Sequence, residues 1–160
     1  MGASTNQPNQ TSFMKSIVVT LLALATLSLN AATPAEEKAF LDSYQKAFEA
    51  GDAKKLESFL YTAGASGEAL EFFKMMMGAE AGQKVSKIEL VAPSAEEMKK
   101  LNEPMEMPDG KMYRMAIKPM KQLVIVIEKK DDSGSSKSTQ KAPVAEKDGK
   151  LVIPVPVPVK

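Results

Sequence analysis

The sequence predicts one α+β domain, because patterns typical of helices come first along the chain and patterns typical of strands follow them. Two observations carry this prediction. Residues 33–61 have the features of a capped amphipathic helix pair, and an Asp-Gly turn at 148–149 joins two apolar runs near the C-terminus. A chain of 160 residues is long enough to bury one core and too short for two comfortable domains.

Residues 1–32 are expected to be an N-terminal extension followed by a secretory signal peptide, with Met14 as the true start because a basic residue follows it. The apolar run Ile17–Leu29 would rise only about 20 Å as a helix, whereas a bilayer needs about 30 Å. The alternative, a buried core helix, has no polar face to present. We expect cleavage after Ala32, which leaves a single domain over 33–160. After cleavage this domain is expected to have no membrane association and to be secreted or periplasmic.

The segment 33–51 has both ends of a helix. Thr33 and Glu36 form a Thr-x-x-Glu capping box, and Gly51 ends the helix in a conformation that glycine adopts easily. Asp52 is expected to cap a second short helix. The buried face of the first helix is formed by residues at helical spacing: Phe40, Leu41, Tyr44, Ala47 and Phe48.

The remaining chain changes from a helical to a strand pattern. We expect a loop at 62–67 and a third helix at 68–82, with Leu70, Phe73 and Met77 facing inward. A strand at 83–93, a short helix or turn at 94–103 and a strand at 111–118 are expected next. The chain should end with a strand at 121–130 that is buried on both faces, a flexible polar loop at 131–141 and a closing hairpin over 142–157. Residues 131–141 are small and polar, which is why a loop is expected there.

Prolines alternate with apolar residues in the last segment, 151–160. Proline lacks a backbone N–H, and the amides of residues two apart in a strand point to the same side. The missing donors therefore lie along one edge, at Pro154, Pro156 and Pro158. We expect an edge strand whose other edge can pair through Ile153, Val155 and Val157. The alternative is a polyproline II tail that binds another protein.

Two segments resemble one known superfamily. Residues 40–61, FLDSYQKAFEAGDAKKLESFLY, resemble the opening helix pair of the nuclear transport factor 2-like superfamily, which includes SnoaL-like and ketosteroid isomerase-like proteins, and residues 143–153, PVAEKDGKLVI, resemble its closing hairpin. The resemblance implies a cone-shaped, cystatin-like roll, in which a curved antiparallel sheet wraps around the first helix and often encloses an apolar cavity. The tryptophan common after the last Asp-Gly-Lys is Leu151 here, and the Asp and His pairs of the superfamily's enzymes are not recognisable.

Composition excludes several mechanisms. The chain has no cysteine and no histidine, so disulfides, thiolate nucleophiles, cysteine-ligated zinc and histidine general bases are all absent. The net charge of +1 gives no indication of nucleic acid as a partner. We expect no cofactor.

The methionines after residue 33 all fall between 75 and 120: Met75, Met76, Met77, Met98, Met105, Met107, Met112, Met115 and Met120. Clustered thioethers in an exported protein can bind Cu(I), and they can equally fill an irregular core or line an adaptable pocket. Without histidine to assist, packing is the favoured interpretation, and no metal site is expected.

These observations favour a non-catalytic exported binding or interaction module, which holds a small apolar molecule or a protein partner. The alternative is a small lyase or isomerase that uses a buried carboxylate and a tyrosine. The residues expected to line the cavity are Tyr44, Phe48, Phe73, Met77, Tyr113 and Met115. No catalytic residue is assigned, because almost every Asp and Glu falls in a cap, a turn or a polar face. Monomeric and homodimeric states stay open.

Overall fold

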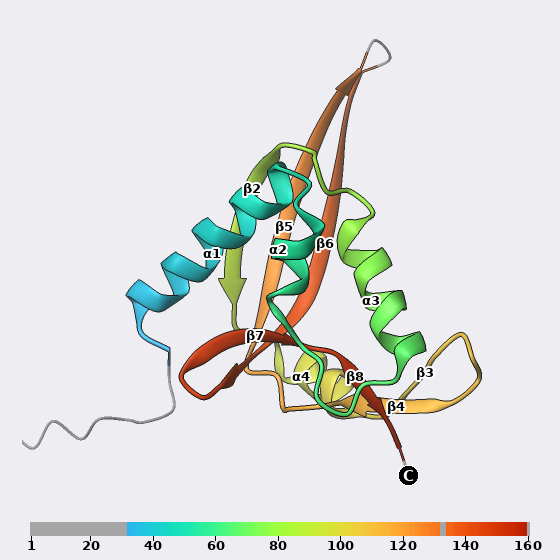
Figure 1. Ribbon diagram of the computed structural model, residues 1–160. Helices are drawn as coiled ribbons and strands as arrows, with labels where there is room; N and C mark the ends of the chain where they lie inside the picture. The colour runs from blue at the N-terminus through green and yellow to red at the C-terminus, as the bar shows by residue number, and fades with distance from the viewer. Residues whose placement is uncertain (1–31, 132–133, 160) are drawn as a thin grey trace, which may run out of the picture.

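The computed structural model describes residues 32–131 and 134–159 and shows a mixed α+β architecture (Figure 1). The helices are α1 Pro34–Glu49, α2 Ala53–Glu57, α3 Gly67–Gly78 and α4 Ala95–Asn102. The strands are β1 Leu60–Tyr61, β2 Val85–Val91, β3 Met105–Glu106, β4 Met112–Met115, β5 Lys121–Asp131, β6 Gly134–Lys147, β7 Lys150–Pro154 and β8 Pro156–Pro158. The predicted α+β class is confirmed.

The helix ends follow the local sequence signals. The capping box of α1 forms between Thr33 and Glu36, and Gly51 follows the helix with φ +64°. Asp52 caps α2 through the backbone N–H of Lys55, as predicted. A second capping box begins α4, which settles the choice between helix and turn there in favour of a helix.

The larger sheet has the strand order β1-β7-β6-β5-β2, and β3-β4-β8 forms a smaller one. The larger sheet is mixed, because β1 runs parallel to β7 while the other neighbours are antiparallel. The prediction of a wholly antiparallel sheet is therefore wrong at this pair. The chain enters β1 from α2 and not from a hairpin, so nothing forces it to run against β7.

The predicted loop at 131–141 is wrong for Asp131, which ends β5, and for residues 134–141, which belong to β6. The two strands pair in a continuous register from Lys121↔Val144 to Asp131↔Gly134, and residues 132 and 133 lie outside the described residues. The two strands form a long hairpin that projects past the helices (Figure 1). The partner strand imposes extended backbone on a small, polar sequence with weak strand propensity. The turn between β6 and β7 is where the sequence predicted it, at Asp148 and Gly149, which have φ +52° and +72°.

Two further strand predictions need correction. The strand expected at 111–118 ends at Met115, since the chain bends at Ala116 and Ile117 before buried Pro119. Burial of β5 on both faces is also wrong, because Leu123, Ile125 and Ile127 are fully covered whereas the two valines between them are only half-buried.

The C-terminal segment forms the one-sided strand that its prolines predict. The amides of Ile153 and Val155 donate to Phe59 and Tyr61 next to β7, at 2.8 and 3.0 Å. Further along the same edge, the Val159 amide donates to Met112 of β4, at 2.9 Å. A loose polyproline tail does not fit this pairing. Pro154 and Pro156 are fully buried, however, so their edge is covered by protein and is not an exposed sheet border.

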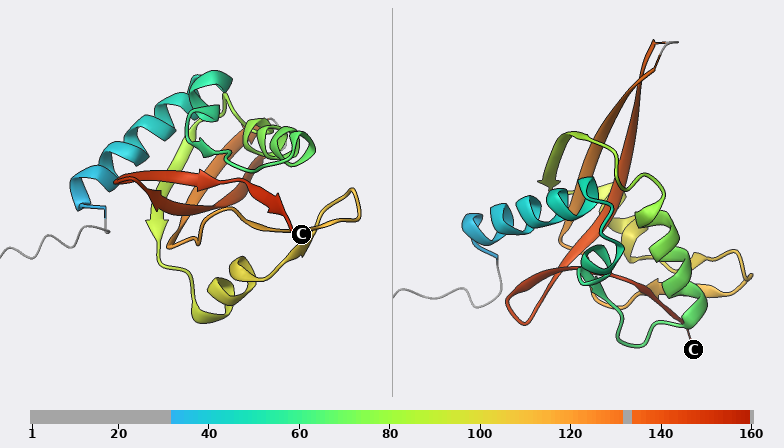
Figure 2. Two further views of the ribbon diagram at one scale, coloured as in Figure 1. Left: turned by 60° about the horizontal axis from the view of Figure 1, so that its bottom comes forward. Right: turned by 45° about the horizontal axis from the view of Figure 1, so that its top comes forward.

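Helices α1, α2 and α3 lie on one side of the larger sheet, and α4 lies on the other (Figure 2, left). The core between the first three helices and the sheet is built on an aromatic ladder, in which the rings of Phe40, Tyr44 and Phe48 follow one another along α1, with Phe59 against the first two. No helix of the described residues is long and apolar enough to cross a membrane.

Candidate functional site

An apolar pocket lies between α3, α1 and the sheet and has a volume of about 290 Å³. Its walls come from five elements: Tyr44 of α1, Phe73, Met76 and Met77 of α3, Ile125 of β5, Gln140, Lys141, Ala142 and Pro143 of β6, and Ile153 of β7. We call this the α3 pocket. Its size and lining are those of a site for a small apolar molecule.

The α3 pocket lies where β6 and β7 separate. The ladder between them ends at Ala145↔Val152. Two residues further along each strand, the next hydrogen-bonded pair would join Pro143 to Pro154, because ladder positions alternate with a period of two. Neither residue has an N–H to donate, so the ladder stops there. Beyond this point β6 continues beside β5 while β7 crosses towards β1 (Figure 1).

Tyr44 supplies a polar group to an otherwise apolar wall. Its side chain is only 1 % exposed, and its hydroxyl accepts or donates no hydrogen bond among residues 32–131 and 134–159. Tyr44 lines the α3 pocket, and its hydroxyl is not one of the fully covered polar atoms. Burial raises the pKa of Tyr44 well above its usual value, so the phenol is neutral and available as a donor.

The polar residues at the rim of the α3 pocket are already engaged with acids. Gln140 donates to Glu80 at 3.0 Å, and Ser138 and Lys129 contact the same carboxylate. The contact with Lys129 is the main reason that the pKa of Glu80 is lowered. These groups tie the end of the α3 segment to the β5–β6 hairpin.

Lys141 is matched by a carboxylate in the same way. Its ammonium lies 3.1 Å from Glu97 of α4. The backbone N–H of Ser94, and then Lys141, lower the pKa of Glu97 to about 2. Glu97 therefore stays ionised at ordinary pH, and its pair with Lys141 lies on the α4 side of the larger sheet, away from the helices that cover the α3 pocket (Figure 2, left).

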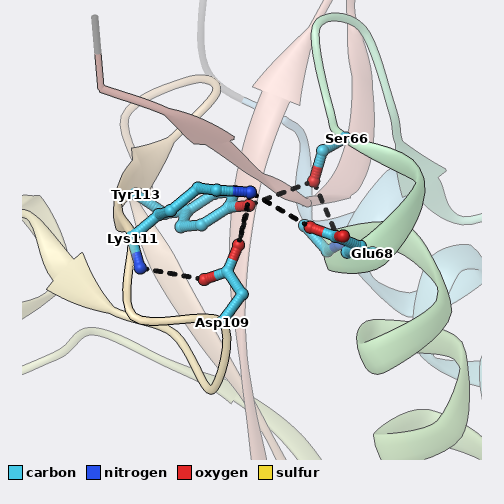
Figure 3. Close-up of polar contacts among 6 residues, drawn as sticks. Ser66, Glu68, Asp109, Lys111 and Tyr113 are labelled. Carbon is cyan, nitrogen blue, oxygen red and sulfur yellow. Dashed lines mark hydrogen bonds and ion pairs between the residues drawn. The ribbon is translucent and has the colours of Figure 1, made fainter.

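A second group of polar residues surrounds Tyr113 (Figure 3). The Tyr113 hydroxyl donates to Asp109 at 2.8 Å and lies 3.3 Å from the hydroxyl of Ser66. Lys111 lies between two acids, 3.4 Å from Asp109 and 3.5 Å from Glu68. The cluster joins the N-terminus of α3 to the turn before β4, beside a cavity of about 330 Å³ lined also by Phe72 and Met107.

The Tyr113 cluster does not have the properties of an acid–base pair. The backbone N–H of Lys111 is the main cause of the lowered pKa of Asp109, and the Tyr113 hydroxyl adds to the effect. Asp109 is therefore a carboxylate held in its charged form, with weak basicity and no proton to give at neutral pH. Its side chain is 21 % exposed, so burial does not compensate. The contacts fix the turn around Gly110 against α3.

The structure divides the predicted cavity-lining residues. It brings Tyr44, Phe73 and Met77 together in the α3 pocket. Phe48 is fully buried in the core and does not line the α3 pocket. Tyr113 lines the separate cavity beside Asp109, and Met115 belongs to neither lining. Sequence reasoning missed Ile125 and Ile153, because apolar strand residues give no signal that separates a pocket wall from a core. It missed the 140–143 segment because residues 140 and 141 were expected in a loop, and it missed Met76 because that residue lies off the predicted inward face of α3.

The methionine-rich stretches do not converge on one point. In α3 the side chains of Met75, Met76 and Met77 are 64 %, 45 % and 7 % exposed, which means that they face different surroundings. Three successive thioethers in a helix cannot surround one Cu(I) ion. In the part of the chain that the structure describes, no three acidic side chains gather in a way that could hold a hard metal ion.

No protein-family model, curated protein or solved structure matches this chain.

Proposed function

We propose that this protein is a non-catalytic binding module that holds a small, neutral, apolar molecule in the α3 pocket. The observation that carries the proposal is Tyr44, a buried residue of the apolar pocket wall whose neutral hydroxyl has no hydrogen bond among the described residues. A bound acceptor would supply that hydrogen bond, which is worth about 0.5–1.5 kcal/mol. The ligand that fits has an apolar body and one acceptor such as a carbonyl oxygen.

The rim supports the choice of a neutral ligand. Lys141 is paired with Glu97, and Gln140 is held by Glu80. An anionic ligand would find no free cation among the lining residues, because the Lys141 ammonium is paired with Glu97 on the α4 side of the sheet. A cationic ligand would meet an apolar wall without a free carboxylate among the lining residues.

The second candidate is a lyase or isomerase, and the contact between Asp109 and Tyr113 is the observation that favours it. A general base of this kind needs a pKa near neutrality, which burial would have to supply. The lowered pKa and partial exposure of Asp109 work in the opposite direction. We therefore rank the binding module first.

We also propose that the domain is a nuclear transport factor 2-like cone and that the protein is exported. A nuclear transport factor 2-like cone is supported by a long first helix packed against a curved sheet, with a pocket beside it. Export rests on the signal-like residues 1–32, of which all but Ala32 lie outside the described residues. Recovery of an exported chain that begins at Thr33 would support it, and an uncleaved chain retained in the cytoplasm would contradict it. A protein partner or a homodimer is a further proposal that sedimentation of the purified protein can test.

The proposed function can be tested with prodan, a neutral naphthalene ketone whose fluorescence reports an apolar environment, and with naphthalene, which lacks the acceptor. We expect wild-type protein to bind both. Tyr44→Phe should weaken prodan binding about 2- to 10-fold, which corresponds to one hydrogen bond, and leave naphthalene binding unchanged. Tyr61→Phe is the matched control, because Tyr61 is half-buried and lines none of the α3 pocket.

A filling variant provides an independent test. Ala142→Phe places a ring in the pocket wall and should abolish binding of both probes, whereas Ala63→Phe, at an exposed turn position outside the lining, should not. Equal binding by wild type and Ala142→Phe would show that the probes bind elsewhere. The α3 pocket would then lose its proposed role.

A further inference from the structure

Helix α3 carries three consecutive methionines in three different environments. Met75 is 64 % exposed, Met76 is 45 % exposed and Met77 is 7 % exposed. Met76 and Met77 line the α3 pocket, and Met75 does not. Met76 therefore combines two properties that its neighbours divide between them: its thioether is open to solvent, and its side chain forms part of the pocket wall.

An exposed thioether reacts with two-electron oxidants such as hydrogen peroxide. The sulfur lone pair attacks one peroxide oxygen, the S–O bond forms as the O–O bond breaks, and proton transfer releases the second oxygen as water. The sulfur is oxidised by two electrons and the peroxide is reduced by two. The product is a sulfoxide, which is polar and a strong hydrogen-bond acceptor, in place of a flexible apolar side chain.

The surroundings of Met76 make this change matter for binding. The wall residues Phe73, Met77 and Ala142 have no side-chain donor, and Gln140 and Lys141 are engaged with Glu80 and Glu97. The remaining donor, the Tyr44 hydroxyl, is the group that the proposed ligand uses, so a sulfoxide oxygen bonded to it would compete with the ligand. An apolar ligand in the pocket would cover that oxygen and deprive it of water, at the cost of an unsatisfied polar group. The unoxidised side chain carries no such cost.

We propose that Met76 is a peroxide-sensitive modification site that controls the α3 pocket, so that sulfoxidation of this one residue releases the apolar ligand. This inference rests on the proposed binding function. Met75 can be oxidised without touching the pocket, and Met77 is shielded by burial. The regulation therefore belongs to the middle residue of the three.

The test treats the full-length protein with hydrogen peroxide, maps sulfoxides by peptide mass spectrometry, and measures naphthalene and prodan binding before and after. Met76 should be oxidised well before Met77, and binding of both probes should weaken about tenfold or more. Treatment with methionine sulfoxide reductases and a thiol reductant should restore it. Met76→Leu is compared with its own untreated affinity, which peroxide should leave unchanged because leucine has no thioether.

A triple variant provides the matched control. Met75, Met112 and Met120 are also exposed and lie outside the pocket lining. With all three replaced by leucine, peroxide should still weaken binding as in wild type. If untreated wild type binds neither probe, the binding function fails and this inference with it. If untreated protein binds and oxidation of Met76 leaves the affinity unchanged, or if Met76→Leu remains sensitive, only the redox inference is overturned.

Discussion

Replacing Pro154 by alanine tests why the C-terminal strand alternates prolines with apolar residues. Pro154 is fully buried, and its edge of β7 has no strand beside it once the ladder with β6 ends at Val152. Alanine would introduce a backbone N–H at that buried edge. The ladder acceptor opposite this amide would be the Pro143 carbonyl, but β6 and β7 have separated at that point, so the proline ring removes a donor that has no partner in this fold.

The size of the effect can be worked out from three contributions. A buried N–H without a partner costs about 1–3 kcal/mol. Loss of two buried methylene groups costs about 0.8 kcal/mol for each. Loss of the proline constraint on the unfolded chain costs about 0.4–1 kcal/mol. We expect Pro154→Ala to lower the free energy of unfolding by about 3–6 kcal/mol.

Pro158→Ala is the matched control, because Pro158 has the same strand parity and is exposed, so water can solvate its new amide. Only the unfolded-state contribution of about 0.4–1 kcal/mol should remain there. The assay is equilibrium unfolding in urea followed by far-ultraviolet circular dichroism, with the slope compared between variants to check two-state behaviour. Losses of equal size at Pro154 and Pro158 would refute the donor argument.

Two further predictions concern the Val155 amide of the same strand and the ion pair between Glu97 and Lys141. Val155→Pro removes the amide that donates to the carbonyl of Tyr61, so it should destabilise the fold by about 3 kcal/mol or more. Hydrogen exchange in the wild-type protein should find the Val155 amide protected. Rapid exchange of that amide would show that the strand is not paired. The pKa of Glu97 is lowered from 4.5 to about 2, mainly by the Ser94 amide and then by Lys141, so its stabilising effect is complete above pH 4.5 and is lost as pH falls towards 2. The stability difference between wild type and Glu97→Gln should shrink over that range in acid unfolding curves, and a constant difference would contradict the assignment.

Sequence signals predicted the elements whose causes are local. The capping boxes at Thr33 and Ser94 depend on residues three positions apart, and the structure reproduces both. The parity of the C-terminal prolines also depends only on strand geometry, and the donors fall on the expected edge. What failed was the region whose conformation depends on a distant partner, since residues 134–141 become a strand only by pairing with β5.

The pocket could be predicted only in part. Tyr44, Phe73 and Met77 share inward helix faces, so helical periodicity finds them. The opening itself arises where β6 and β7 separate, and that depends on Pro143 meeting Pro154 across a ladder whose register is set by the turn at Asp148. A single proline in each of two strands becomes informative only when that register is known.

The most direct test of the binding proposal is a nuclear magnetic resonance titration of methyl-labelled methionine with prodan. The account predicts that the methyl signals of Met76 and Met77 shift and show cross-peaks to the bound naphthalene ring, because both line the α3 pocket. The signals of Met112 and Met120, which are exposed and outside it, should not move. Shifts confined to Met112 and Met120, or no shift at millimolar prodan, would contradict the account.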